Sequence, residues 1–326
     1  MQTKRVERYT HTKLTFRGKQ NAMSLKMNVL AAQFKPKKGD YNANLHTVGQ
    51  LFAQISQEKI AADVLVLPET AMSGYFLEGG VREVARSSEE LFRELNAEYL
   101  NNTDGAPLDI VVGFYEQWQR KYYNSCLYAT LGREGAGVVH THRKFFLPTY
   151  GVFDEKRFVT RGRVIDAFPT RFDGTKVALL ICEDIWHSVS ATIAALKGAQ
   201  ILYVVSASPG RGFADDTMDT VTRYKEILTN IADEHGIWVV YCGLVGFEGG
   251  KGFTGASRIA DPFAVTRLVG PVNKEALLKA EIDLDDVAVA RANSPLLGDL
   301  ESNLADITLE LQSIEREAHF GNRNPI

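Results

Sequence analysis

Short apolar runs alternate with amphipathic stretches along most of the chain. The pattern predicts strands over residues 28–34, 63–69, 109–116, 123–131, 138–144, 176–182, 199–206, 237–245, 253–260, 264–269 and 276–283. Runs such as 64–67 and 201–205 are typical of strands buried on both faces. Apolar residues spaced by three and four predict helices over residues 42–60, 87–100, 187–198 and 217–235. A β-α-β-α-β order begins at residue 28 and again at residue 176.

This repeated order predicts an α/β fold in which two sheets pack face to face with helices outside each, a four-layer αββα sandwich. No linker rich in Pro, Gly or Ser separates the two halves, so we expect one domain over residues 27–299. Residues 300–326 form a helical extension whose apolar residues lie at helical spacing. We expect this helix to pack on its own domain, and a subunit interface is the alternative.

The first 26 residues carry seven Lys or Arg and a single acid, Glu7, without an apolar segment. This composition does not fit a secretory signal and predicts a disordered basic tail, with a transit peptide as the alternative. For the whole chain, a net charge of −3 and a pI near 6.2 disfavour nucleic acid as the main partner. An odd count of three scattered cysteines indicates a reducing, cytoplasmic location. No apolar run approaches the roughly 18 residues of a membrane span, so we expect no membrane partner.

Three predicted strands end in side chains that are suited to acyl transfer. Cys182 closes the run 176–182, Glu69 ends the strand 63–69, and Lys144 ends the strand 138–144. A strand delivers its last side chain to the rim of a sheet, where a substrate can reach it. A thiol, an acid and an amine at three such rims predict hydrolysis through a covalent thioester on Cys182.

Each of the three groups has a separate task in this chemistry. A free thiol is mostly protonated near neutral pH, so it needs a base, and Glu69 is the candidate. The tetrahedral intermediate places negative charge on oxygen, which the Lys144 ammonium and the backbone N–H of Glu183 can stabilise. Glu69 can then return its proton to the departing amine and activate the water that hydrolyses the thioester.

Each residue also has an ordinary structural interpretation. A single Cys at the end of an apolar strand is often an inert core residue, as we expect for Cys126 and Cys242, and a Lys at a strand end is usually solvated. His140 and His142 lie two apart on one strand, but no third ligand is spaced nearby, so we predict no metal site. His187 follows Cys182 on a helix start and is badly placed as its base, and the chain has no Gly-x-Ser-x-Gly motif for a serine hydrolase.

Three stretches resemble the signature blocks of the nitrilase superfamily of carbon–nitrogen hydrolases. They are LPETAMSGY at 67–75, RKFFLPTYGVFDEKRF at 143–158 and LICEDIW at 180–186, and they occur in the family's order. The resemblance covers the chain from about Met27 to the region 295–299. It implies a nitrilase-like αββα sandwich that acts without a cofactor and forms a homo-oligomer of at least two subunits.

The resemblance also implies roles for individual residues. Glu69 would be the general base, Lys144 the stabiliser of the intermediate and Cys182 the nucleophile. Glu155 matches a second glutamate that contacts the lysine or the substrate amide in many members, and the alternative is a surface acid. The substrate pocket would be lined by Tyr75, Tyr150, Glu183, Trp186 and Ser208.

Within the superfamily, the stretches 147–158, 182–186 and 206–209 are most similar to the glutaminase domain of glutamine-dependent NAD synthetases. This implies a small primary carboxamide substrate, of the glutamine or ω-amide type. No phosphate-binding loop follows Cys182, so the alternatives are a free-standing amidase and a glutaminase subunit that supplies ammonia to a separate synthetase. A hydrolase of nitriles or N-carbamoyl compounds is a further alternative. A non-catalytic scaffold is less favoured, because the four residues that match the family's catalytic positions are all present.

Overall fold

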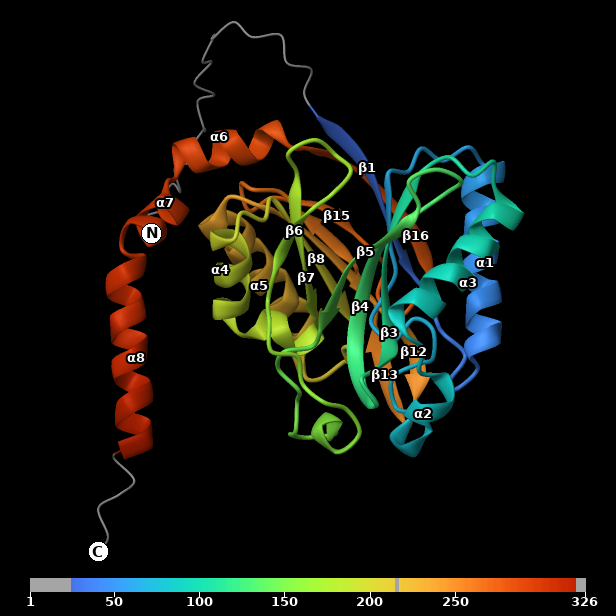
Figure 1. The fold of residues 1–326 in the computed structure, drawn as a ribbon, viewed down its shortest axis with the longest axis horizontal. Helices are drawn as coiled ribbons and strands as arrows, with labels where there is room; N and C mark the ends of the chain where they lie inside the picture. The colour runs from blue at the N-terminus through green and yellow to red at the C-terminus, as the bar shows by residue number, and fades with distance from the viewer. Residues whose placement is uncertain (1–24, 215–216, 321–326) are drawn as a thin grey trace, which may run out of the picture.

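The structure is a computed structural model that describes residues 25–214 and 217–320. Two six-stranded sheets pack face to face (Figure 1). The first has the order β16-β1-β2-β3-β4-β5, formed by Ala276–Asp283, Lys26–Gln33, Val64–Val66, Leu108–Trp118, Lys121–Leu131 and Gly137–Arg143. The second has the order β15-β14-β11-β8-β7-β6, formed by Thr266–Val269, Arg258–Ala260, Trp238–Gly243, Ile201–Ser206, Lys176–Ile181 and Ala167–Pro169.

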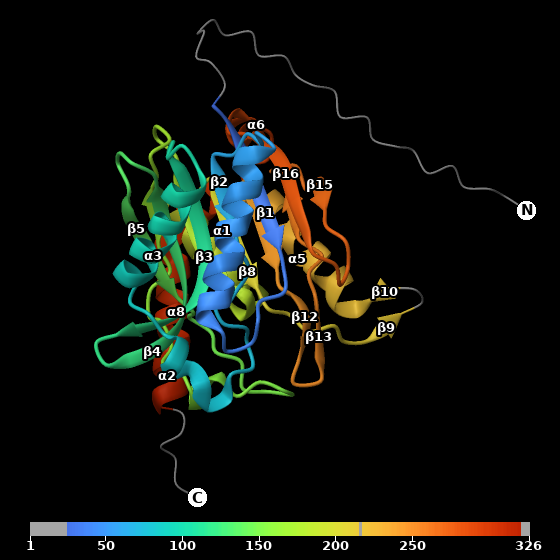
Figure 2. The ribbon, with the colours of Figure 1, turned by 90° about the vertical axis from the view of Figure 1, so that its right-hand side faces the viewer.

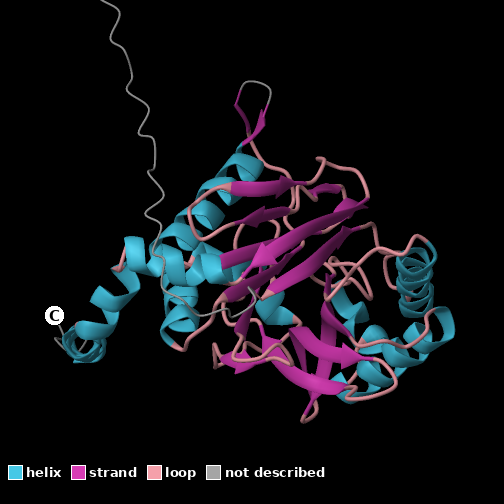
Figure 3. Cartoon of the chain, turned by 90° about the horizontal axis from the view of Figure 1, so that it is seen from above, coloured by secondary structure: helices cyan, strands magenta, loops and turns pink. Residues whose placement is uncertain are grey.

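Helices cover the outer face of each sheet (Figure 2). The first sheet is covered by α1 (Tyr41–Gln57) and α3 (Ser88–Asn102), and the second by α4 (Ser188–Leu196) and α5 (Asp219–His235). Alternate residues of each strand face opposite sides, as β2 illustrates: Leu65 packs under the helices, and Val64 and Val66 pack between the sheets. The predicted four-layer αββα sandwich is confirmed, and the view from above shows its two sheets stacked (Figure 3).

The predicted strand over residues 253–260 is wrong as a single element. The structure divides it into β13 (Lys251–Thr254) and β14, because Gly255 and Ala256 between them take left-handed backbones, with φ 63° and 49°, which interrupt the extended conformation. The strand β13 pairs with β12 (Val245–Glu248) in a separate hairpin that the sequence pattern did not predict. A second short hairpin pairs β9 (Phe213–Ala214) with β10 (Thr217–Met218).

The chain ends in three helices beyond β16. They are α6 (Asp285–Asn293), α7 (Leu296–Ser302) and α8 (Leu304–Phe320), and α8 stands away from the sandwich in Figure 1. Its apolar side chains Leu304, Leu311 and Ile314 are exposed, so the expected packing on its own domain is not observed. Most of the predicted basic tail, residues 1–24, lies outside the described residues.

Two further elements lie near the carboxyl ends of the strands. The short helix α2 (Val81–Val84) follows the segment after Glu69, and the segment 144–166 joins β5 to β6. Among the described residues, no helix is long and apolar enough to cross a membrane.

Candidate active site

Cys182 follows β7 directly and begins the short 3₁₀ helix η3 (Cys182–Trp186). Its backbone is left-handed, with φ 47°, which is uncommon for a residue other than glycine and is often found at functional sites. The side chain is 6% exposed and lines a cavity of about 290 Å³. The sharp turn at the buried end of β7 therefore brings the thiol to the wall of a ligand-sized cavity.

Glu69 lies three residues beyond β2 and is fully buried. Its backbone passes so close to β3 that a Cβ atom on Gly113 would lie 2.5 Å from the Glu69 Cα atom. Only glycine fits at this crossing. The Oε2 atom of Glu69 accepts a hydrogen bond from the backbone N–H of Ala207 at 2.6 Å, just after β8. The acid thus belongs to the first sheet and is fixed by the second.

Lys144 directly follows β5, and its ammonium joins two carboxylates. The Nζ atom donates to Oε1 of Glu69 at 2.8 Å and to Oε1 of Glu155 at 2.8 Å. Asn124, on β4, donates to the same two oxygens at 2.7 and 3.2 Å. Glu155 begins the 3₁₀ helix η2 (Glu155–Arg157) and is buried, so it is not the surface acid that we considered as an alternative.

Burial and charge shift the protonation of these groups. Burial and, to a lesser extent, the Glu69 carboxylate raise the pKa of the Cys182 thiol to about 12, against the opposing effect of Lys144. Burial alone would lower the pKa of Lys144, but Glu155 and Glu69 outweigh it and hold that pKa well above its usual range. Burial also raises the pKa of Glu155, against the effect of Lys144. The lysine is therefore a permanent cation, and the resting thiol is protonated at neutral pH.

The predicted pocket residues line two neighbouring cavities. Tyr150, Glu183, Trp186 and Ser208 line the same cavity as Cys182. The hydroxyl of Tyr150, which is half exposed, donates to Oε2 of Glu183 at 2.8 Å. Tyr75 lies elsewhere, in a neighbouring cavity of about 540 Å³ that Glu155 also lines and that Cys182 does not. Its hydroxyl donates to Oε1 of Glu155 at 2.5 Å.

Several residues at the site were missed by sequence reasoning. Tyr224 on α5 places its hydroxyl 3.8 Å from the Cys182 sulfur, and that oxygen also accepts from Trp186 Nε1 at 2.9 Å. Arg211 and Arg223 line the Cys182 cavity. Only Asn124 left a signal, as an amide within a mostly apolar predicted strand; the others look like ordinary helix and loop residues.

Asp184 has a structural task beside the thiol. Its carboxylate accepts from the backbone N–H groups of Ile181, Phe145 and Phe146 at 2.8 to 3.1 Å. It also lies 2.9 Å from Nε2 of His142. These bonds tie the segment after Lys144 to the end of β7, so one buried acid fixes Cys182 and Lys144 relative to each other.

His140, the other histidine considered for a metal, stacks on Phe168 with ring centroids 4.4 Å apart. Across the described residues, no three His, Cys, Asp or Glu side chains form a group that could hold a metal ion.

The geometry can be set beside known proteins. The family model for carbon-nitrogen hydrolases matches residues 28–292. The chain is 26% identical over 263 residues to a glutamine-dependent NAD(+) synthetase of Thermotoga maritima, covering 80% of this chain and 43% of that protein. It is 28% identical to a probable nitrilase of Schizosaccharomyces pombe, covering 82% of this chain and 93% of that protein. The chain thus spans less than half the length of the first synthetases that it matches.

Solved structures show the same relationship. A glutamine-dependent NAD+ synthetase from Acinetobacter baumannii superimposes with a TM-score of 0.68 at 26% identity, over 81% of this chain and 47% of that one. A carbon-nitrogen hydrolase from Helicobacter pylori superimposes with a TM-score of 0.73 at 22% identity, over 86% of this chain and 99% of that one, and shares the fold. The chain belongs to the carbon-nitrogen hydrolase family of enzymes.

Proposed function

We propose that the protein hydrolyses a small primary carboxamide to a carboxylate and ammonia through a thioester on Cys182. The observation that carries this proposal is the buried ammonium of Lys144, which is bound to both Glu69 and Glu155 close to a Cys182 thiol that lines a cavity. These are the charges that acyl transfer requires, and they are fixed before substrate binds.

In the first half-reaction, Glu69 takes the thiol proton as the sulfur attacks the carbonyl carbon. The oxyanion is stabilised by the Lys144 ammonium and the backbone N–H of Glu183. Collapse of the intermediate breaks the carbon–nitrogen bond, and Glu69 returns the proton to the leaving ammonia. The raised thiol pKa supports this order, because a thiol that is protonated at rest needs a base during attack.

In the second half-reaction, water enters in place of ammonia. Glu69 takes a proton from the water, whose oxygen attacks the thioester carbonyl. The same donors stabilise the second tetrahedral intermediate, the carbon–sulfur bond breaks, and the thiolate regains its proton from Glu69. The product forms as the carboxylic acid, loses its proton to solvent or to the released ammonia, and leaves as the carboxylate, so the resting state is restored.

The lining of the Cys182 cavity supports an acyl group that carries charge of its own. Arg211 and Arg223 offer guanidinium groups that suit a carboxylate, and Glu183 offers a carboxylate that suits an ammonium. A volume of about 290 Å³ suits a short acyl chain. Glutamine carries both charges on such a chain, so it is our first candidate substrate, with related ω-amides next.

A dependent role is the second candidate. The similarity to glutamine-dependent NAD(+) synthetases, at 26% and 27% identity, supports a glutaminase role in which the released ammonia is supplied to a synthetase. The resemblance to a probable nitrilase supports a nitrile substrate as an alternative, and N-carbamoyl compounds are a further one.

The test is an ammonia-release screen with the purified protein. The substrates are glutamine, asparagine, short aliphatic amides, a nitrile and an N-carbamoyl compound, with Cys182→Ala as the control. We expect release from an amide, a loss of at least about a thousandfold in the control, and an acyl adduct on Cys182 in the intact mass with a slow substrate. Activity retained by Cys182→Ala would exclude the thioester, and release only with an added synthetase would favour the dependent subunit.

A further inference from the structure

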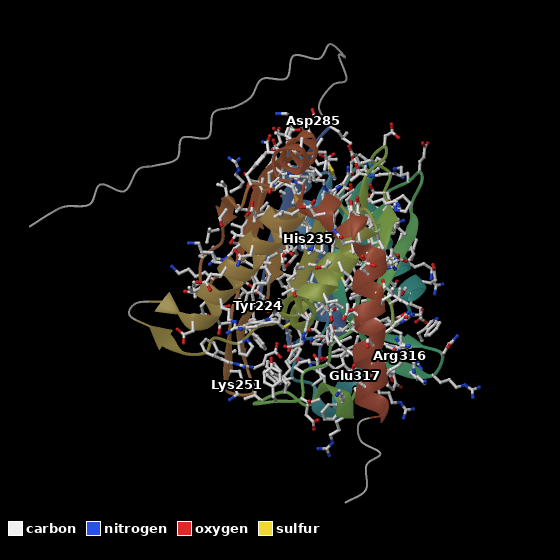
Figure 4. All side chains as sticks on the ribbon, turned by 90° about the vertical axis from the view of Figure 1, so that its left-hand side faces the viewer. Tyr224, His235, Lys251, Asp285, Arg316 and Glu317 are labelled. Carbon is white, nitrogen blue, oxygen red and sulfur yellow. The ribbon has the colours of Figure 1, made fainter. Side chains whose placement is uncertain are left out.

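Glu248 is a buried carboxylate that the proposed chemistry does not use. It ends β12 on the hairpin with β13, far along the chain from the predicted catalytic residues, and is 6% exposed. Figure 4 shows that Lys251 of this hairpin lies toward the same end of the molecule as Tyr224, which contacts the nucleophile. The hairpin therefore reaches the end of the sandwich that holds the active site.

The Glu248 carboxylate holds the backbone of the segment that follows Glu69. Its Oε2 atom accepts from the backbone N–H of Tyr75 at 2.8 Å and from that of Phe76 at 3.1 Å. On the other side of the same residue, the carbonyl oxygen of Tyr75 accepts from the Tyr115 hydroxyl at 2.8 Å. Side chains from two distant strands thus fix both the N–H and the carbonyl of Tyr75.

Tyr75 passes this constraint to the candidate catalytic groups. Its hydroxyl donates to Oε1 of Glu155 at 2.5 Å, the same oxygen that accepts from Lys144. Its ring packs edge to face against Phe76 and Phe153. A continuous path of contacts therefore runs from Glu248 through Tyr75 and Glu155 to the Lys144 ammonium.

A carboxylate is a costly way to hold two N–H groups in this place. Burial raises the pKa of Glu248, and the second oxygen, Oε1, has no hydrogen-bond partner among the described residues. The chain also makes room for this oxygen: Gly74 has φ 77°, and a Cβ atom there would lie 2.7 Å from Oε1. A buried, half-satisfied carboxylate calls for an explanation beyond packing, because an apolar contact would carry no desolvation penalty.

We propose that Glu248 is a positioning residue that acts through Tyr75: by fixing the Tyr75 backbone, it keeps the tyrosine hydroxyl on Glu155 and so sets the position of the Lys144 ammonium. This inference rests on the proposed function, since it assigns Glu248 to the turnover step. The acyl group binds in the Cys182 cavity, which neither Glu248 nor Tyr75 lines. Loss of Glu248 should therefore lower kcat and leave KM almost unchanged.

The test is a double-mutant cycle on the full chain with the amide found by the screen. We expect Glu248→Ala to lower kcat by roughly 10- to 100-fold with KM within about twofold, because displacing a catalytic group by about 1 Å costs on that order. In a Tyr75→Phe background the same change should cost less than about threefold, since the hydroxyl through which Glu248 acts is already absent. Glu248→Gln keeps a carbonyl acceptor and should stay within about threefold of wild type.

Matched variants keep the result interpretable. Phe247→Ser changes a neighbour on β12 that is 65% exposed, and it should leave kcat unchanged. If Glu248→Ala does not fold, Glu248→Asp takes its place, because it retains the charge and withdraws the carboxylate by one methylene. An equal loss of kcat in both backgrounds, or a rise in KM that accounts for the whole effect, would overturn the proposal.

A second readout needs no substrate and separates this proposal from the proposed function. Iodoacetamide should alkylate Cys182, because Cys126 and Cys242 are fully buried, and intact mass follows the rate. We expect Glu248→Ala to change this rate by at least about threefold, and to have no effect when Tyr75 is Phe. An unchanged rate refutes the role of Glu248. A changed rate in a protein that releases no ammonia refutes only the proposed function.

Discussion

Lys144 is the residue on which the charge balance of the site depends. Its ammonium is the only cation in hydrogen-bond contact with the Glu69 and Glu155 carboxylates in the described part of the chain, and it is fully buried. In a medium of low dielectric, removing one partner of such a group leaves an uncompensated charge, which costs far more than the net value of the intact group. Catalysis and stability are therefore coupled at this position.

Lys144→Met tests that coupling. We expect ammonia release to fall by about two to three decades, because the oxyanion loses its cation. The free energy of unfolding, measured with urea, should fall by about 3 kcal/mol, because two carboxylates remain buried without a counter-charge. Lys144→Met/Glu155→Gln removes one of those charges and should recover part of the stability but none of the activity. Unchanged stability in the single variant would contradict the assigned charges.

The pH dependence of Cys182 alkylation follows from its raised pKa. A thiol with a pKa of about 12 stays protonated in the resting protein up to strongly alkaline pH, and only the thiolate reacts. The alkylation rate without substrate should therefore rise about tenfold per pH unit from pH 7 to 10 and show no plateau in that range. A plateau near neutral pH would instead mean a resting thiolate paired with Lys144.

At the scale of the element, close contact between neighbouring segments positions Glu69, the proposed general base. The backbone of Glu69 lies against β3 at Gly113, where any side chain would collide with it. Gly113→Ala should lower ammonia release at least tenfold and cost about 1–3 kcal/mol of stability, as overpacking does. Gly137→Ala on β5 is the matched control, because a Cβ atom there meets no atom within 4 Å. Similar activity in both variants would show that activity tolerates a displacement of the Glu69 backbone by the added methyl group.

The strand ends of the candidate site were predictable from sequence, and the partners across the sheets were not. Glu69 and Cys182 each follow an apolar run, and Lys144 ends a predicted strand, so the sequence pattern marks all three positions. Asn124 reaches Glu69 because β4 and β3 pair in one register, and Tyr224 reaches Cys182 because α5 packs on the second sheet in one orientation. Register and packing angle are tertiary properties that the periodicity of a single segment does not contain.

At the scale of the whole molecule, the layers were predictable because long segments repeat one pattern. The strand Ile201–Ser206 is apolar up to its last residue and buried throughout, as a strand covered on both faces requires. The hairpin of β12 and β13 escaped prediction because its strands have four residues each and include glycine. Glu248, the proposed positioning residue on this hairpin, was therefore not predicted either.

The helix α8 bears on assembly. Its exposed apolar residues Leu304, Leu311 and Ile314 recur at the spacing of a helix-pairing stripe, and we propose that they join copies of this chain in a homo-oligomer. Leu311→Ser/Ile314→Ser should lower the molar mass measured by light scattering to that of a monomer. The change in unfolding free energy of the sandwich should stay below about 0.5 kcal/mol, because these side chains are exposed.

Gln312→Ser, on the same helix, changes an exposed polar residue and should leave the molar mass unaltered. A wild-type protein that is monomeric at working concentration would rule out this role for α8.

The candidate catalytic residues come from both sheets: Glu69 and Lys144 follow strands of the first, and Cys182 follows a strand of the second. The rate of turnover therefore depends on the relative position of the two sheets. Mild denaturation that shifts one sheet by about 1 Å relative to the other would abolish activity, while circular dichroism would still report intact secondary structure. Thermal inactivation should accordingly precede melting, and an additive that wedges the sheets apart would inhibit without ever touching the thiol.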